Sequence, residues 1–460
     1  MLLLRRILPA LLAALPLLAA DYEVGPGKPL AELEEVPWER LEAGDTVRIH
    51  WREAAYRSKF VLCRQGTVDA PIRVLGVPGP DNQRPVIDGR DALTRRELNY
   101  WGEERGVVKI GGANQPADTT PAHIVLAGLE IRSGRQPFAF QGRNGRTDYR
   151  KNAASVIVEK GEHIVLRDLV LHDSGNGLFV SPESRDILVE GCHIHDNGVE
   201  GSIYEHNSYT QARGITFQHN RYGPLRQGCP GNNLKDRSAG LVVRYNWIEG
   251  GNRQLDLVDG PAYAGEPAYR TTLVYGNILV EPDGEGNRQI VHYGGDSGKP
   301  AGYRQGVLHF YNNTVVSRRR DRTTLLRLSS DGERADLRNN LIYPEAGGKT
   351  LEILSTHGQA EMHGNWLRQG WQPSFGFSAL SGTVNSVKDN LAGDQPGVAD
   401  APNNDWHLLP DSPCRNAAIP LHPDIPEEHR VTRQWNGIGQ WTERADGGGR
   451  HIGAFAPVQP

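Results

Sequence analysis

The sequence predicts an all-β protein with a right-handed parallel β-helix fold, a solenoid of short strands with an asparagine ladder and an N-terminal cap. Short aliphatic and β-branched runs recur between polar turns, and no segment keeps a helical period. Equivalent positions of successive runs are about 23 to about 40 residues apart, as in solenoid repeats. An asparagine closes each of the later runs: Asn220, Asn246, Asn277, Asn313, Asn340, Asn365 and Asn390.

Earlier runs follow the same pattern with a different closing residue. The runs HIVLAGLEI, HIVLRDLVL and DILVEGCHI place Leu129, Leu169 and Cys192 where the later runs have asparagine. An asparagine can occupy a bend in the left-handed region of backbone conformation. Its amide can then bond to the equivalent asparagine one coil above and below. We therefore expect the seven asparagines to stack along one edge of the solenoid.

The first twenty residues have the layout of a secretory signal peptide. Arg5 and Arg6 give a positive start, an apolar run follows from residue 7 to residue 18, and two alanines precede Asp21. The run is short for a membrane span, and the sequence has no other long apolar stretch. We expect an exported protein, periplasmic or secreted, with no stable membrane span once residues 1–20 are removed.

The repeats also divide the rest of the chain. Residues 21–120 are expected to form an N-terminal cap and the first coils, residues 121–395 the central β-helix with groove-forming loops, and residues 396–460 a closing segment. A short helical turn between Pro29 and Glu35 is expected to plug the open end of the core, because terminal repeats need a cap. No linker marks a second independent domain, and we expect a monomer.

Charge and cysteine content exclude some classes of function. The net charge is −4, and loss of the two signal-peptide arginines makes it about −6. A weakly acidic protein has no global electrostatic attraction to nucleic acid, although cations gathered in one groove could still hold an anionic polymer. The four cysteines have no CxxC spacing, so a zinc cluster is not predicted.

Large insertions interrupt the coils in the middle of the chain. Loops added to successive coils line up on one side of a solenoid and wall a groove, so these insertions predict where a ligand binds. They occupy residues 135–155, 197–214, 222–235, 259–270 and 281–305.

Two polar clusters about one coil apart lie among these insertions. They are YEHNSYTQARG, with His206, Tyr209 and Arg213, and GNNLKDRSAGLVVRYN, with Asn233, Lys235, Arg237 and Arg244. Alternation along a strand places Lys235 and Arg237 on the same side. The resulting cationic site suits the carboxylate of a uronate sugar, which indicates an anionic polysaccharide as partner.

A family resemblance rests on three motifs. The opening GDTV…GT…PI…IDG, the asparagine-bearing coils and the closing HLLPDSPC…IGAF resemble the β-helix polysaccharide lyases of the chondroitinase B and alginate lyase group. The resemblance implies β-elimination on a uronate-containing glycan, and Lys235 matches the lysine of that group. The group's arginine belongs about one coil later in an R-H-G run, where this chain has QLDLVDG with Asp256. Arg237 or Arg244 would have to replace it, or Tyr209 and His206 would transfer the proton.

We therefore predict four catalytic residues in one exposed groove that the 281–305 insertion walls. Lys235 or Tyr209 would remove the C5 proton, His206 would assist, and Arg237 would neutralise the substrate carboxylate. Substrate contacts are predicted for Asn233, Arg213, Arg244, Asp256 and His292, with His292 and Tyr293 near the rim. The alternative for both cations is a structural ion pair with Asp256 or Asp236.

Two other classes of function remain open. A glycoside hydrolase would use two carboxylates that flank the bond, either Asp256 with Asp259 or Glu200 with Glu205. A non-catalytic surface protein would only bind glycan. No motif requires a cofactor, and the loop carboxylates allow a Ca²⁺ site without EF-hand spacing.

Overall fold

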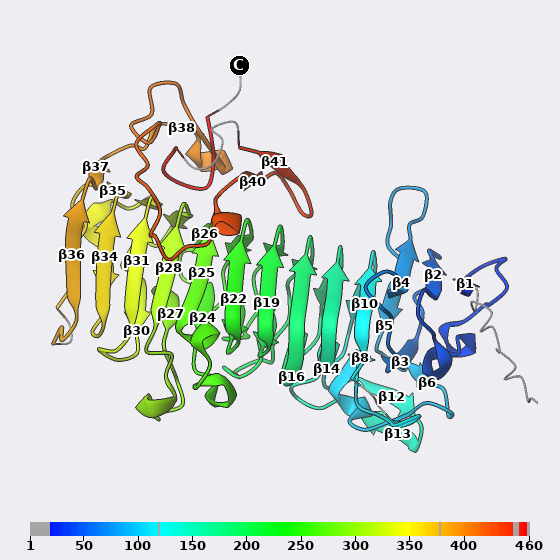
Figure 1. Ribbon diagram of the computed structural model, residues 1–460. Coiled ribbons are helices and arrows are strands. Elements are labelled where there is room, and N and C mark those ends of the chain that lie inside the picture. The colour runs from blue at the N-terminus through cyan, green and yellow to red at the C-terminus, as the bar shows by residue number, and fades with distance from the viewer. Residues whose placement is uncertain (1–18, 118–119, 377–378, 445–449, 458–460) are drawn as a thin grey trace, which may run out of the picture.

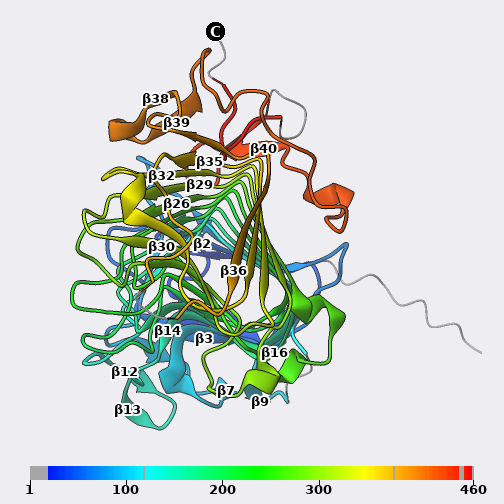
Figure 2. The same ribbon diagram turned by 90° about the vertical axis from the view of Figure 1, so that its left-hand side faces the viewer.

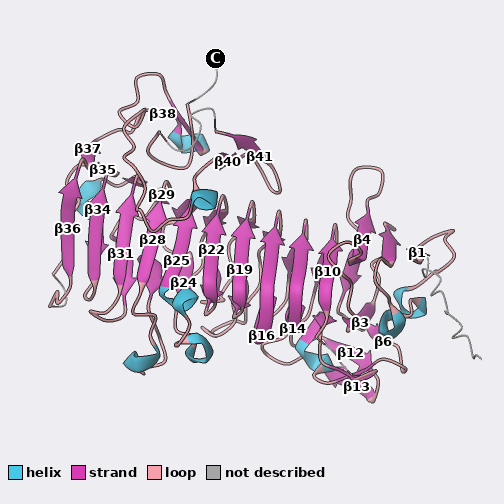
Figure 3. Ribbon diagram, in the orientation of Figure 1, coloured by secondary structure: helices cyan, strands magenta, loops and turns pink. Residues whose placement is uncertain are grey.

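The computed structural model describes residues 19–117, 120–376, 379–444 and 450–457, and these form a parallel β-helix (Figure 1). Strands of successive coils pair in parallel and in register from the N-terminal β1 (Asp21–Val24) to β37 (Leu391–Gly393). Strands dominate the chain, and its helices are short turns in the connecting loops (Figure 3). The predicted fold class is confirmed.

Each complete coil contributes one strand to each of three faces, which superpose when viewed from the β36 end of the solenoid (Figure 2). The first face contains β3 (Ser58–Leu62), β8 (Gly106–Ile110), β18 (Ser208–Thr210), β21 (Leu234–Asp236), β24 (Leu255–Leu257), β27 (Gln289–Tyr293), β30 (Thr323–Leu328) and β33 (Leu351–Leu354). The second contains β1, β2 (Thr46–His50), β4 (Ile72–Val77), β10 (Ala122–Ala127), β19 (Arg213–Gln218), β22 (Ala239–Arg244), β25 (Thr271–Tyr275), β28 (Val307–Tyr311), β31 (Arg334–Arg338), β34 (Gln359–His363) and β36 (Thr383–Lys388). The third contains β5 (Val86–Asp88), β11 (Glu130–Arg132), β15 (Val170–His172), β17 (His193–Ile194), β20 (Arg221–Tyr222), β23 (Trp247–Glu249), β26 (Ile278–Glu281), β29 (Thr314–Ser317), β32 (Leu341–Pro344), β35 (Trp366–Arg368) and β37.

Two long strands, β14 (Ala154–Arg167) and β16 (Asn176–Glu190), run through the first and second faces without a break. Downstream of β16 each coil instead has two separate strands on these faces. The remaining short elements lie in loops: β6 (Leu93–Thr94), β7 (Asn99–Tyr100), β9 (Ala113–Gln115), the hairpin β12 (Ala139–Gly142) and β13 (Gly145–Asp148), and the 3₁₀ turns η3 (Glu103–Arg105), η4 (Pro261–Tyr263), η5 (Pro267–Arg270), η6 (Pro300–Gly302) and η7 (Gly348–Thr350).

The predicted asparagine ladder is present and complete. Along the seven asparagines each side-chain Nδ2 donates to the Oδ1 of the next, at 2.9 to 3.1 Å. The same Nδ2 atoms also donate to backbone carbonyls, as Asn277 does to Val243 at 2.9 Å. Each Oδ1 accepts a backbone N–H as well, so these buried amides are satisfied from both sides.

The left-handed backbone position is not where the sequence placed it. The residue before each ladder asparagine has the positive φ, as His219 (57°), Tyr245 (57°) and Gly276 (65°) show. This preceding residue turns the chain at the corner, and the asparagine after it can then direct its amide inward. The same holds before Leu129, Leu169 and Cys192, where Gly128, Asp168 and Gly191 take positive φ values.

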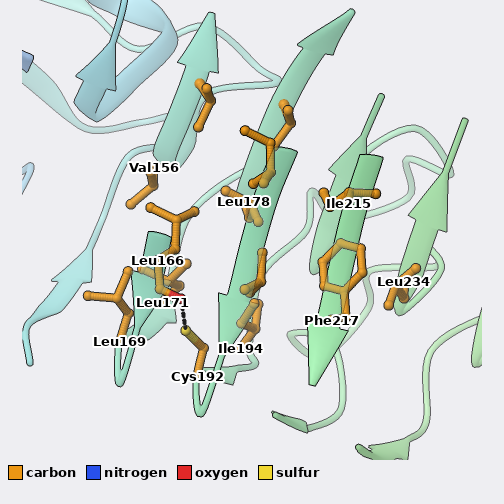
Figure 4. Packing of buried hydrophobic residues seen from close by; sticks show 14 of the residues in the cluster. Val156, Leu166, Leu169, Leu171, Leu178, Cys192, Ile194, Ile215, Phe217 and Leu234 are labelled. Atoms are coloured by element: carbon orange, nitrogen blue, oxygen red, sulfur yellow. Dashed lines mark hydrogen bonds between the residues drawn. The ribbon is translucent and has the colours of Figure 1, made fainter. Parts of the chain in front are cut away.

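Aliphatic side chains stack inside the solenoid from coil to coil. Leu166, Val189, Phe217 and Val243 occupy one register column of the second face, and all are fully buried. Figure 4 shows such columns in the central coils, with the Cys192 thiol donating to a backbone carbonyl. Full burial of an aliphatic or aromatic side chain contributes about 1.5–3 kcal/mol, so the repeated columns stabilise the whole length of the solenoid.

At the N-terminal end the strands begin at Asp21, because β1 already pairs in parallel with β2. The 3₁₀ turns η1 (Leu33–Glu35) and η2 (Trp38–Arg40) cover this end, where Trp38 stacks on Phe60 at 3.9 Å. The helical turn predicted between Pro29 and Glu35 is thus shorter than expected and occupies only the C-terminal part of that range. Residues 1–18 of the predicted signal peptide lie outside the described residues. Among the described residues, no helix is long and apolar enough to cross a membrane.

The C-terminal segment leaves the solenoid and packs on the outside of its third face (Figure 1). It contains β38 (Val398–Asp400), η8 (Ala401–Asn403), β39 (Asp405–Leu408), η9 (Glu427–His429), β40 (Arg433–Trp435) and β41 (Trp441–Glu443). Trp406, Leu408 and Phe455 of this segment pack in one buried cluster with Trp247 and Trp366 of the coils. The segment covers apolar surface on the third face and also contacts Tyr275 and Tyr311 of the second face.

Candidate functional site

A cavity of about 780 Å³ opens over the first face in the middle of the solenoid. We call it the groove. One side chain from each of six successive coils lies in register along its floor: Phe179, Tyr209, Lys235, Asp256, His292 and Arg327. Paired strands are about 4.8 Å apart, so the floor presents a new side chain at roughly that interval. The neighbours Leu234 and Leu255 are buried on the inner side.

Loops from two insertions line the groove. Gly295, Asp296 and Ser297 come from the 281–305 insertion, and Glu205 and His206 come from the 197–214 insertion. The prediction that the 281–305 insertion walls the site is confirmed. Tyr204 and Ile203 stand at the rim as exposed apolar side chains.

Two cations and a loop carboxylate form the centre of the groove. Lys235 Nζ donates to Asp256 Oδ2 and to Asp296 Oδ2, both at 2.6 Å. Arg237 Nη2 donates to Asp296 Oδ1 at 2.8 Å, and its Nε donates to the Tyr209 hydroxyl at 3.0 Å. The carboxylate of Asp296 therefore bridges the two cations, and the phenol of Tyr209 lies beside them.

The carboxylate of Asp256 forms hydrogen bonds with several side chains. Its Oδ1 lies 2.7 Å from His292 Nδ1, and its Oδ2 also accepts from Asn232 Nδ2 at 2.7 Å. Burial alone would raise the pKa of Asp256, but the Lys235 ammonium and the His292 hydrogen bond hold this pKa well below its ordinary value. His292 Nε2 is also within 2.9 Å of Ser329 Oγ, which completes a chain of fixed polar groups.

His206 is a neutral donor in this arrangement. Its Nδ1 accepts the backbone N–H of Asn232 at 2.9 Å, so the ring proton is on Nε2. Burial, together with the charge of Lys235, lowers the pKa of His206 to about 3. The ring meets Tyr209 edge-on at 5.5 Å. At neutral pH His206 can donate a hydrogen bond but holds no imidazolium charge.

The four side chains predicted to be catalytic, Lys235, Arg237, His206 and Tyr209, line this one groove together. Lys235 was predicted in an exposed groove, but its side chain is buried: it is only 7% exposed and is held between two carboxylates. The alternative of an ion pair with Asp256 is therefore present in the structure. The roles of these residues in a reaction remain predictions.

Among the predicted substrate contacts, Asp256 and His292 line the groove, but three other residues do not. Asn233 is fully buried and accepts from Asn207 Nδ2 at 2.7 Å within the solenoid. Arg213 pairs with Glu266 at 2.9 Å, outside the groove. Arg244 lies on the second face, where it donates to Gln218 and Tyr275. Tyr293, predicted near the rim, is also fully buried and faces inward.

The prediction for Asn233 is wrong for a physical reason. Alternation with Lys235 would direct Asn233 outward, but it precedes the first residue of β21 at a corner between strands, where alternation does not hold. The structure adds Asp296, Asn232 and Arg327 to the site. The run of glycines around Asp296 marks a loop, yet no repeat in the sequence registers this loop with the cations.

Metal ligation was left open in the sequence. In the described part of the chain, no group of three or more His, Cys, Asp or Glu side chains is arranged to hold a metal ion. The carboxylates Asp256 and Asp296 are instead neutralised by Lys235 and Arg237.

No protein-family model matches the chain, and no curated protein matches its sequence. Solved structures do match. The pectate lyase Pel9A is 11% identical over 96% of this chain and 97% of its own, with a TM-score of 0.53. An alginate lyase from Paenibacillus sp. str. FPU-7 is 12% identical over 76% of this chain and 95% of its own, with a TM-score of 0.45. A GH136 lacto-N-biosidase from Eubacterium ramulus is 12% identical over 82% of this chain and 68% of its own, with a TM-score of 0.44.

At such low identity the similarity to Pel9A shows the fold and not the activity. The β-helix fold is shared with this polysaccharide lyase. The resemblance to β-helix polysaccharide lyases expected from the sequence is therefore confirmed for the architecture.

Proposed function

We propose that this protein binds an acidic polysaccharide in the groove and cleaves it by β-elimination. The observation that carries the proposal is the convergence of Tyr209, Lys235 and Arg237 in one cavity, with Arg237 Nε donating to the phenol oxygen at 3.0 Å. Elimination from a uronate requires a base for the C5 proton and cations for the charge that develops on the carboxylate. These three side chains supply both.

The geometry favours Tyr209 over Lys235 as the base. The Lys235 ammonium directs its hydrogen bonds to Asp256 and Asp296, so it acts as a fixed cation. The phenol oxygen of Tyr209 accepts from Arg237, and this arrangement stabilises negative charge on that oxygen. When Tyr209, as the phenolate, takes the C5 proton, the C5–H electrons form the C4–C5 double bond and the C4–O4 bond breaks. The leaving O4 then takes the proton from Tyr209, while His206 Nε2–H donates a hydrogen bond to the sugar.

A glycoside hydrolase is the second candidate, and Glu205 is the observation that favours it. Glu205 lines the groove, is buried, and has no hydrogen-bond partner for Oε2 within the described residues. The other carboxylates suit a hydrolase poorly. Asp256 and Asp296 share one ammonium, which with other partners lowers the pKa of both, so neither keeps a proton for a leaving group. Asp259 is fully buried.

Incubation with polygalacturonate, alginate and chondroitin tests the proposal. A lyase generates the ultraviolet absorbance of an unsaturated uronate, whereas a hydrolase generates reducing ends without it. Tyr209→Phe should abolish the absorbance and keep glycan binding. Tyr22→Phe, on the first coil far from the groove, is the matched control and should retain activity. Reducing ends without absorbance, lost in Glu205→Gln, would replace the lyase by a hydrolase.

A further inference from the structure

We propose that Lys235 and Arg237 form a binding site for the carboxylate of an acidic sugar, and that Asp296 fills this site when no glycan is bound. The inference rests on the binding part of the proposed function and deepens it by naming the group that is recognised. Asp296 places one carboxylate oxygen 2.6 Å from Lys235 Nζ and the other 2.8 Å from Arg237 Nη2. A carboxylate bound through both oxygens to two cations is the contact that a uronate would make.

Asp296 lies between the cations and solvent. Its side chain is 31% exposed, whereas those of Lys235 and Arg237 are 8% and 16% exposed. All three line the groove. A ligand entering from solvent therefore meets Asp296 before it reaches either cation.

The cations keep other partners when Asp296 leaves. Lys235 retains Asp256 at 2.6 Å, and Arg237 retains the Asp259 carbonyl at 2.5 Å and the Tyr209 hydroxyl at 3.0 Å. When the Asp296 side chain moves out of the site, neither buried cation is therefore left without a partner. An incoming carboxylate would restore the two bonds that were lost.

Asp256 differs from Asp296 in this respect. It is almost fully buried and bonds to Lys235, His292 and Asn232 at once, so a substrate cannot exchange with it. Asp296 has only the two cations as side-chain partners among the described residues. The exchangeable carboxylate is therefore Asp296.

Rotation of one side chain is sufficient for the exchange. The backbone N–H groups of Asp296 and Ser297 donate to Asp259 Oδ1 at 2.8 and 3.3 Å, and the N–H of Gly295 donates to Ser329 Oγ at 2.8 Å. These bonds hold the loop backbone in place while χ1 of Asp296 changes. A neutral sugar cannot restore the two ion pairs, so Asp296 also selects acidic glycans over neutral ones.

Binding titrations with polygalacturonate and alginate, and with dextran as a neutral polymer, test this inference. Asp296→Ala should lower the Kd for at least one polyuronate by about tenfold, because an internal competitor and a like charge are removed. Dextran should remain unbound. Asp283→Ala is the matched control, since it removes one exposed carboxylate from the same insertion and should leave the Kd unchanged. Asp296→Asn, nearly identical in shape, serves if the alanine variant folds poorly.

Unchanged or weaker polyuronate binding in both Asp296 variants would overturn the inference and make Asp296 a positioning residue for the cations. Failure of every polyuronate to bind wild type and variants alike would overturn it too. These binding results can be distinguished from a failure of the lyase proposal. Tighter binding in the variants without ultraviolet absorbance would support the carboxylate site and contradict β-elimination. Ultraviolet absorbance with unchanged affinity in the variants would support β-elimination and contradict the exchange of Asp296.

Discussion

The asparagine ladder and the floor of the groove are built by the same in-register stacking, yet they hold opposite kinds of side chain. In the ladder one neutral amide repeats on seven coils, and each rung satisfies the next with bonds of 2.9 to 3.1 Å. On the groove floor no residue repeats: Tyr209, Lys235, Asp256 and His292 occupy equivalent positions of four coils.

This difference indicates how a solenoid separates stability from chemistry. A repeated residue bonds to copies of itself, so its position follows from the architecture and it needs no ligand. A column without repetition sets different charges side by side, and each has to be balanced by its neighbours or by a ligand. The Lys235 ammonium between Asp256 and Asp296 shows the first kind of balance, and the exchange proposed for Asp296 shows the second.

The largest effect is expected for Lys235→Ala. The change removes a cation from the groove and leaves Asp256 buried without its ammonium, so turnover should be lost and the free energy of unfolding should fall by about 3 kcal/mol. Denaturant titration and the absorbance assay measure the two effects. Lys28→Ala, at a weak surface pair of 3.9 Å, is the control and should change neither. A Lys235→Ala protein with wild-type stability would mean that the ion pair contributes nothing to folding.

Asn277→Ala tests the other region. It breaks the ladder and removes the partners of the Asn246 backbone N–H and the Val243 carbonyl, which should cost about 2–4 kcal/mol of unfolding free energy. The folded fraction should keep its specific activity, because the ladder lies away from the groove. Asn390→Ala, at the last rung, should cost less, since it has a partner on one side only. Equal losses at both positions would show that the ladder does not act as a continuous network.

The two regions also differ in how far the sequence determines them. The ladder could be predicted because seven asparagines recur at one phase, and the column of Tyr209 and Lys235 followed from the same spacing. The position of Asp296 in the groove could not be predicted, because the 281–305 insertion has no repeat that fixes its register with β21. Asn233 was misplaced because alternation fails at the corner before that strand. The left-handed backbone conformation was assigned to the ladder asparagine and not to the residue before it, since composition alone does not separate adjacent turn residues.

Stability should depend on pH through His206 in the groove. The pKa of His206 is about 3 in the folded protein and near 6.5 when unfolded, so the unfolded chain binds an extra proton between these values. His206 therefore makes unfolding easier as the pH falls from about 6.5 toward 3, by at most about 1.4 kcal/mol per pH unit. His206→Asn should flatten this slope in denaturant titrations. The loss caused by Asn277→Ala should be the same at pH 5 and pH 7.5, and a pH-dependent loss would mean that this rung is coupled to a titrating group.

The smallest effect is expected for Arg213→Ala, which examines where the functional surface ends. Arg213 was predicted to contact substrate, but its guanidinium pairs with Glu266 at 2.9 Å with both side chains partly exposed, and it does not line the groove. Surface pairs of this kind contribute about 0–1 kcal/mol, so the variant should unfold at nearly the wild-type denaturant concentration. Its KM and kcat on a polyuronate should also be unchanged, whereas Arg237→Ala should lower kcat because Tyr209 loses its donor. A raised KM for Arg213→Ala would extend the glycan path beyond the groove, over the loop that carries Glu266.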